Sequence, residues 1–265
     1  MRQTDVLLYA LFAQSLRSYF CAKNLQSKPP LRTALRDGSQ PLKIVFLPGM
    51  DGTGLLFKGL IQNIPKEIDR EVVCLNEIEG ESYHQQAEEV AEHIGSSSVV
   101  LVAESYSGRI AYELCNILGR RVSRVVFIAS FISCPGRLGR LAALLPELFL
   151  KPNFFPDWLM KTLCFDGRGN RVLIEQVRQA ITEVEPSVLK RRLLNIAELD
   201  RPKGHLSTEA VYIRPTNDRL VGYDAIKVLG NVYPKLSIES LEGGHFIAQT
   251  APERCARVIV RAITT

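Results

Sequence analysis

The chain has 265 residues, of which 46% are hydrophobic and 23% charged, a composition typical of a globular protein with one large core. The formal net charge is +5, and no basic run with interleaved aromatic residues occurs, which argues against nucleic-acid binding. No apolar run reaches about 18 residues, which excludes a spanning helix, and six cysteines without paired spacing favour free thiols in a cytoplasmic protein.

Residues 1–40 are expected to form a helical N-terminal extension. Val6–Phe20 is apolar and aromatic, which predicts a helix that packs on the domain or lies at a membrane surface. A signal peptide is the alternative, but the apolar core would be short and no small-x-small cleavage site follows it. Lys28-Pro29-Pro30 is a linker signal that separates this segment from the rest.

Leu42–Leu47 predicts a buried strand, and a glycine-rich loop follows it: Pro48-Gly49-Met50-Asp51-Gly52-Thr53-Gly54. Such a loop lets the backbone approach a ligand closely. A phosphate-binding loop is one interpretation, but no Lys follows the glycines and there is no GxGxxG. The other is the oxyanion loop of a hydrolase, in which the backbone N–H of Met50 is the donor.

Val99–Glu104 predicts a second buried strand, which continues into Ser105-Tyr106-Ser107-Gly108 and an amphipathic helix ending at Gly119. Small residues at 103 and 107 flank Ser105, the pattern of a nucleophile elbow with Ala and Ser where Gly is commoner. A helix N-cap is the simpler interpretation of Ser105 alone. In an elbow, Tyr106 contributes the second oxyanion N–H.

The segments between and after these motifs predict a sheet interrupted by a helical insertion. Glu71–Leu75 and Arg124–Ala129 are expected strands, and Ser82–Ile94 an expected helix with surface histidines. Residues 131–207, which include Pro135, Pro146, Pro152 and Pro156, show no strand pattern, which predicts an inserted helical cap. The cap holds twelve Lys or Arg against eight Asp or Glu, and Lys190-Arg191-Arg192 is its densest basic run, interpreted as a solvated face or a docking surface.

Two late strands are each followed by a polar side chain. Asp218 follows the expected strand Glu209–Arg214, and His245 follows Leu236–Leu241. The helix Glu253–Ile263 closes the domain. Because the carboxyl ends of parallel strands share one edge of a sheet, we expect Asp218 and His245 to lie beside Ser105.

The chain order Ser105, Asp218, His245 is that of a hydrolase catalytic triad. A serine hydroxyl needs a base to act as a nucleophile near neutral pH. His245 can take and return its proton, and Asp218 can fix the tautomer and stabilise the imidazolium. Gly243 and Gly244 are expected to leave room for the imidazole.

Taken together, Leu47–Gly54, Glu104–Gly108, Asn217–Val221 and Gly244-His245 resemble the α/β-hydrolase superfamily over roughly residues 42–263. The subgroup most similar is that of esterase-like proteins resembling pimeloyl-carrier-protein methyl ester esterases. The resemblance implies an α/β fold with a mostly parallel central sheet flanked by helices, an inserted helical cap and no cofactor. The core would comprise residues 41–130 and 208–265. Ala103, Ser107 and Pro48 depart from the family pattern.

The sequence thus predicts a serine carboxylic-ester hydrolase that forms an acyl-enzyme on short to medium acyl esters, without metal. A thioesterase or acyltransferase acting on an acyl carrier protein is the first alternative, and a non-catalytic hydrolase-like ligand-binding protein is the second. The residues expected to line the substrate pocket are Gly49, Asp51, Phe131, Trp158 and Phe246.

Overall fold

The computed structural model describes residues 42–136, 140–141, 143–151 and 154–264. The chain divides into two units, residues 1–39 and 40–265, and all described residues belong to the second. The predicted N-terminal extension lies outside the described range. Within that range, no helix is long and apolar enough to cross a bilayer.

A six-stranded sheet forms the centre of this unit, in the order β2-β1-β3-β4-β5-β6, and every neighbouring pair is parallel. From β1 the chain moves outward to β2 and then returns to place β3 on the other side of β1. This reversal is a topological switch point, where open α/β sheets bind ligands. The strands are β1 (Lys43–Leu47), β2 (Arg70–Val72), β3 (Val99–Glu104), β4 (Val122–Ile128), β5 (Glu209–Pro215) and β6 (Leu236–Leu241).

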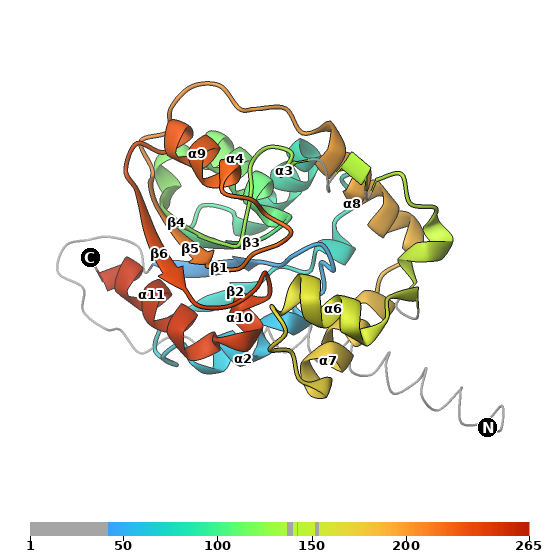
Figure 1. Cartoon of the computed structure of the whole chain (residues 1–265). Helices are drawn as coiled ribbons and strands as arrows, with labels where there is room; N and C mark the ends of the chain where they lie inside the picture. Colours follow the sequence, from blue (N-terminus) through green and yellow to red (C-terminus); the bar gives the residue numbers. More distant parts are fainter. Residues whose placement is uncertain (1–41, 137–139, 142, 152–153, 265) are drawn as a thin grey trace, which may run out of the picture. The chain divides into compact units, whose positions relative to one another are not determined.

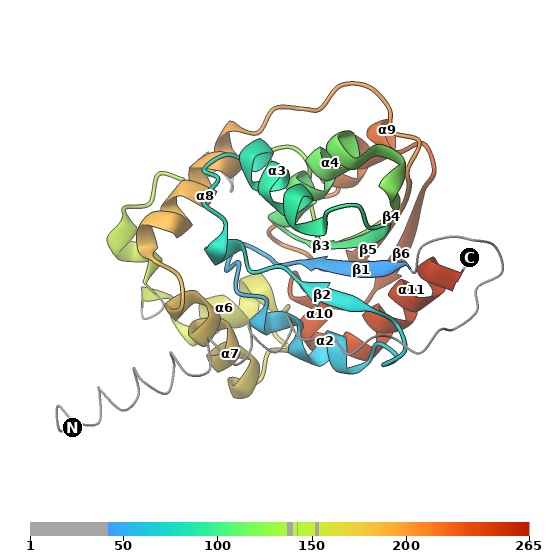
Figure 2. The ribbon, with the colours of Figure 1, turned by 180° about the vertical axis from the view of Figure 1, so that it is seen from behind.

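Helices cover both faces of the sheet, so its central strands β3 and β4 are apolar over most of their length. In β3, Val99, Leu101 and Ala103 face the core under one helix layer, whereas Val102 faces the core under the other. Figures 1 and 2 show the two layers on opposite faces of the sheet. One layer holds α3 (Tyr83–Ile94), α4 (Ser107–Leu118) and α9 (Asp224–Val232), and the other holds α2 (Lys58–Gln62), α10 (Ile247–Thr250) and α11 (Pro252–Thr264).

Residues 131–207, the predicted helical insertion, separate β4 from β5 and contain no strand among their described residues. Part of it packs as a separate small cluster that includes Met160, Phe165, Ile174 and Val177. The insertion lies beside the sheet, at the end where α6 and α8 approach the loops after the strands (Figure 1). Its helices are α6 (Asp157–Cys164), α7 (Arg171–Thr182) and α8 (Pro186–Glu198), with a 3-10 turn at Glu147–Leu150.

Most of the expected elements form within two residues of their predicted ends, because burial and capping agree there. Ser82 makes a capping box with Gln85 and so starts α3 where the sequence predicts. The main difference concerns the predicted strand Glu71–Leu75, because its predicted C-terminal end is wrong. There β2 stops at Val72, and Leu75–Glu77 forms a 3-10 turn whose Leu75 N–H donates to the Gly52 carbonyl. The remaining 3-10 turns are Leu55–Phe57 and Gly119–Arg121.

Candidate active site

Ser105 occupies a strained turn between β3 and α4. Its φ of 48° lies in the left-handed region that non-glycine residues rarely adopt. Three hydrogen bonds hold the turn. The Ser105 N–H donates to the Ile128 carbonyl at 3.0 Å, and the Ser105 carbonyl accepts from Gly108 N–H at 3.1 Å and from Ser130 Oγ at 2.7 Å. The turn places the half-buried Ser105 hydroxyl at the N-terminus of α4, as an elbow requires.

The departures from the usual glycines have local explanations. Ala103 is fully buried in the core beneath α4. The Ser107 hydroxyl donates a short hydrogen bond to the Pro48 carbonyl, so it ties the elbow to the glycine-rich loop. Glycine is needed at Gly108 instead, since a Cβ there would lie 2.2 Å from Ser130 Oγ and 2.5 Å from the Phe131 carbonyl oxygen.

The structure brings the three predicted triad residues together. His245 Nε2 lies 2.9 Å from Ser105 Oγ, and His245 Nδ1 lies 2.9 Å from Asp218 Oδ2. The other oxygen, Asp218 Oδ1, accepts from the N–H groups of Leu220 and Val221, both at 2.9 Å. Asp218 is therefore oriented by its own loop, and the imidazole bridges the carboxylate and the hydroxyl.

Electrostatics within this group favour an ionised Asp218 and a basic His245. Burial raises the pKa of Asp218, but the charge and hydrogen bond of His245 and two backbone N–H groups outweigh it, so the pKa lies below its usual value. Burial lowers the pKa of His245, but the charge and hydrogen bond of Asp218, aided by the charge of Glu104, leave that pKa above its usual value. A carboxylate that favours the imidazolium is what a general base needs when it accepts a proton.

The glycine-rich loop lies directly beside the elbow. A Cβ built on Gly49 would come within 4.0 Å of the Ser105 Cβ. Asp51 is buried and accepts from the Thr53 N–H and hydroxyl through Oδ2, so it stabilises the loop itself. Among the described residues, the backbone N–H groups of Met50 and Tyr106 have no hydrogen-bond partner, which leaves both available to a ligand.

The other predicted pocket residues divide into two groups. Phe246 follows His245, and its ring centroid lies 5.7 Å from the imidazole and 5.2 Å from that of Phe165. Phe131 is buried next to Gly108. Trp158 is 67% exposed on the first turn of α6, and no contact with the triad is formed by its ring among the described residues. Its predicted place in the pocket remains a prediction.

Gly243 and Gly244 have a different role from the one predicted for them. A Cβ at Gly244 would lie 2.7 Å from the Asp166 nitrogen and 2.8 Å from the Cys164 carbonyl oxygen. The Phe246 N–H donates to that same Cys164 carbonyl at 3.0 Å. Gly244 therefore allows the end of α6 to approach the His245 loop, and Gly243 is required by its φ of 153° and the Ile247 side chain.

The prediction that the basic run Lys190-Arg191-Arg192 forms an exposed surface is wrong. Lys190 Nζ donates to the carbonyls of Ala143 and Leu145, and Arg192 is 2% exposed. Only Arg191 is exposed, and it pairs with Glu81. The signal for burial was present in the sequence, because position 192 shares a helix face with the buried Leu189 and Ile196 of α8.

Glu104, which sequence reasoning did not single out, is a second buried charged group near the site. It precedes Ser105 at the end of β3, is 5% exposed, and accepts from Gln249 Nε2 at 3.0 Å. Burial, followed by the nearby charge of Asp51, raises its pKa to about 7, against the opposing effects of Gln249 and His245. A glutamate at the end of an otherwise apolar strand was the available signal.

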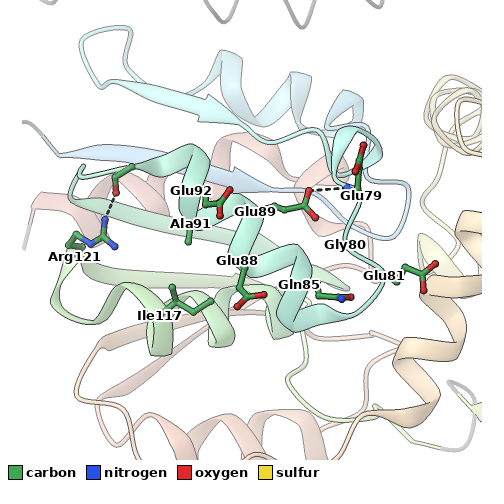
Figure 3. Close-up of a pocket in the computed structure, with 11 residues that line it drawn as sticks. Glu79, Gly80, Glu81, Gln85, Glu88, Glu89, Ala91, Glu92, Ile117 and Arg121 are labelled. Atoms are coloured by element: carbon green, nitrogen blue, oxygen red, sulfur yellow. Dashed lines mark hydrogen bonds between the residues drawn. The ribbon is translucent and has the colours of Figure 1, made fainter.

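A surface hollow of about 770 Å³ lies elsewhere, along α3 (Figure 3), and no predicted site residue lines it. Its lining is acidic, with five glutamates and Arg121, and the Glu89 carboxylate accepts from the Glu79 N–H at 2.9 Å. In the described parts of the chain, no group of three His, Cys, Asp or Glu side chains is arranged to hold a metal ion. The glutamates are Glu79, Glu81, Glu88, Glu89 and Glu92.

No protein-family model and no curated protein sequence matches the chain. Solved structures do match it. An esterase from Exiguobacterium antarcticum aligns with a TM-score of 0.71 at 15% identity, covering 86% of this chain and 94% of its own. An enol-lactonase from Burkholderia xenovorans gives a TM-score of 0.73 at 13% identity, with coverages of 87% and 94%. A thioesterase from the prodiginine pathway of Streptomyces coelicolor gives 0.60 at 18% identity, with coverages of 90% and 95%.

These likenesses establish the fold. The chain has the α/β-hydrolase fold, with an all-parallel six-stranded sheet in its described part, and this confirms the predicted fold class. The finer resemblance to pimeloyl-carrier-protein methyl ester esterases remains a prediction.

Proposed function

We propose that this protein is a serine carboxylic-ester hydrolase that acts on short to medium acyl esters through an acyl-enzyme. The observation that carries the proposal is the continuous chain from Ser105 Oγ to His245 Nε2 and from His245 Nδ1 to Asp218 Oδ2, with 2.9 Å at each link. These are the distances over which a base removes a hydroxyl proton while a carboxylate orients it.

In the acylation step, Ser105 Oγ attacks the ester carbonyl carbon and its proton passes to His245 Nε2. The carbonyl oxygen becomes an oxyanion that the N–H groups of Met50 and Tyr106 stabilise. When the tetrahedral intermediate collapses, the C–O bond to the alcohol breaks and His245 donates its proton to the leaving oxygen. Asp218 stabilises the imidazolium in between.

Deacylation repeats the sequence with water as the nucleophile. His245 accepts a proton from the water as it attacks the Ser105 ester, and the resulting oxyanion occupies the same N–H pair. Collapse releases the carboxylic acid, and Ser105 Oγ regains its proton from His245. Apart from the attacking water, acylation and deacylation use side chains and backbone groups of the chain itself.

A small-molecule ester is the substrate class proposed. The acyl-carrier alternative depended on a basic face of the insertion, and Lys190 and Arg192 do not contribute to one because their charged groups bind backbone carbonyls. Arg168, another basic residue that such a face would have to include, pairs with Glu242.

The test is a series of p-nitrophenyl esters of rising acyl length, with matched thioesters. We expect a pre-steady-state burst of nitrophenol equal to the enzyme concentration, followed by steady turnover that falls for the longest chains. Thioester hydrolysis faster than ester hydrolysis would favour a thioesterase. Ligand binding without any burst or turnover would contradict catalysis and favour a binding protein.

A further inference from the structure

Arg192 of α8 is a buried guanidinium without a carboxylate in contact. Its Nη1 donates to the Met50 carbonyl at 2.8 Å and its Nη2 to the Leu75 carbonyl at 3.0 Å, whereas its buried Nε has no partner among the described residues. Burial lowers the pKa of the guanidinium, although Asp51 is near enough to oppose this effect. Because a buried cation without a paired anion costs stability, its location calls for a functional explanation.

The Arg192 guanidinium holds the glycine-rich loop in place at the turn of the loop. The Gly52 N–H donates to the Gly49 carbonyl at 3.0 Å, and the Gly52 carbonyl accepts from Leu75 N–H at 2.8 Å. A Cβ on Gly52 would lie 2.5 and 2.7 Å from the two terminal nitrogens of Arg192, so the loop backbone packs directly on the guanidinium. Arg192 therefore connects the loop after β1 to the segment after β2.

The same helix contacts the second proposed oxyanion donor. The guanidinium carbon of Arg192 lies 5.9 Å from the ring centroid of Tyr106, within the range of a cation–π interaction. Asn195, one turn later on α8, donates from Nδ2 to the Tyr106 hydroxyl at 3.3 Å. The Tyr106 ring is fully buried and stacks on Tyr83 at 4.6 Å, so its backbone is held from several sides.

We propose that Arg192 is a positioning residue that holds Met50 and Tyr106 so that their backbone N–H groups converge on one oxyanion. The inference rests on the proposed function and adds that α8 of the insertion takes part in transition-state stabilisation. An oxyanion hole acts only when its donors lie about 2.7–3.1 Å from the developing charge. Without Arg192, the Met50 and Leu75 carbonyls lose their hydrogen-bond donor. The glycine-rich loop then changes its conformation so that these carbonyls can accept from other donors.

The experiment compares Arg192→Met and Arg192→Lys with the matched control Arg191→Met, which alters the exposed neighbour. Turnover of p-nitrophenyl acetate is measured per active site, counted by the nitrophenol burst. The acetyl group is small, so contacts between a long acyl chain and the insertion do not contribute. Circular dichroism melting reports folding.

We expect Arg192→Met to lower kcat and kcat/KM together by about 10- to 100-fold with KM unchanged, since the interaction acts in the transition state. This is less than the ~10²–10³-fold loss typical when a donor itself is removed. Arg192→Lys keeps the charge but replaces the two terminal nitrogens of the planar guanidinium with one nitrogen on a differently shaped side chain, so it should be intermediate. Arg191→Met should match the wild type.

A purely structural Arg192 would lower the melting temperature and the number of titrated sites, but leave kcat per site unchanged. That result for Arg192→Met overturns the inference. If Arg192→Met does not fold, Arg192→Lys decides, and a wild-type kcat per site in that variant overturns it. A wild-type protein with neither a burst nor turnover would contradict the proposed function and this inference with it, whereas an active wild type with an unaffected Arg192→Met contradicts this inference alone.

Discussion

The site is assembled from two regions that differ in how they are held in place. Ser105, Asp218 and His245 follow β3, β5 and β6, so the pairing of these parallel strands through β4 determines their positions; the one register shift lies at the start of β3, between Val99 and Val100. The helical insertion approaches the same site through contacts of individual residues rather than through a strand ladder. The Cys164 carbonyl accepts from the Phe246 N–H, and Arg192 donates to the Met50 carbonyl.

This difference in how the two regions are held gives them different roles in the site. These strands are fixed by hydrogen-bond ladders, on both sides for β3 and β5 and on one side for β6, and by two cores, so the sheet can hold reacting groups with little freedom. A helix that contacts the site through individual residues can be altered at one of them without disturbing those ladders. We therefore expect changes on the sheet side to remove chemistry, and changes on the insertion side to reduce its efficiency.

The largest effect is expected for Ser105→Ala, which removes the proposed nucleophile. Loss of a triad serine typically lowers kcat by about 10⁶-fold. The methyl group fits the elbow because the Ser105 backbone, not its hydroxyl, makes the hydrogen bonds of the turn. Ester hydrolysis and circular dichroism measure the two outcomes, and a folded variant with more than a tenth of wild-type activity would exclude Ser105 as the nucleophile.

A smaller loss, of about 10⁴-fold in kcat, is expected for Asp218→Asn. The amide is nearly isosteric but cannot stabilise the imidazolium as a carboxylate does. Asn217→Ala is the matched control, because Asn217 donates to Asp166 and not to His245. If Asn217→Ala proved as damaging as Asp218→Asn, the acid would be assigned wrongly.

On the insertion side, Gly244→Ala should separate α6 from the His245 loop, since its Cβ would lie under 3 Å from three backbone atoms of residues 164–166. Displacing a catalytic group by about 1 Å can cost up to ~10²-fold in rate, so we expect a loss of kcat below that of Asp218→Asn. Gly222→Ala is the control, because a Cβ there meets open space. Equal kcat values for the two variants would show that the α6 contact does not position His245.

The smallest effect on turnover is expected for Glu104→Gln, whose main consequence concerns the stability of the fold. The pKa of Glu104 is about 7 in the folded protein against an ordinary value of 4.5, so the folded state binds more protons in this window. Wild-type stability should therefore fall as pH rises from 4.5 through 7, by about 3 kcal/mol in total. A neutral glutamine avoids this loss.

Urea unfolding of both proteins at several pH values tests the Glu104 prediction. The stability of Glu104→Gln relative to wild type should increase as pH rises, and most of the change should occur below about pH 8. Glu92→Gln, at an exposed position of α3, controls for the loss of one negative charge. A difference between Glu104→Gln and wild type that stays constant with pH would show that Glu104 keeps an ordinary pKa.

The sheet side was predictable from the sequence because each of its features has a local signal. Apolar runs mark strands buried on both faces, and the residue that follows each run lies at a shared edge. Small residues around Ser105 indicate the sharp turn. The triad residues could therefore be named, although their mutual distances depend on strand register that no local pattern specifies.

The insertion side was predictable only as helical. Lys190-Arg191-Arg192 has the pattern of a solvated run, and the helical spacing of Arg192 with Leu189 and Ile196 is the one local signal for its burial. The burial of Arg192 follows from tertiary contacts with Met50 and Leu75, which lie more than a hundred residues earlier in the chain. In the same way, the close approach of Cys164 that requires glycine at 244 cannot be read from either segment alone.

The central claim is that Ser105 is a nucleophile activated by His245, and covalent labelling with a fluorophosphonate tests it most directly. Such a reagent phosphonylates an activated serine, whose oxygen displaces fluoride from phosphorus, and peptide mass spectrometry locates the adduct. We predict one label per chain, on Ser105, with labelling abolished in Ser105→Ala and slowed by orders of magnitude in His245→Ala. A wild-type protein that is folded but stays unlabelled, or that is labelled at another residue, would contradict the account.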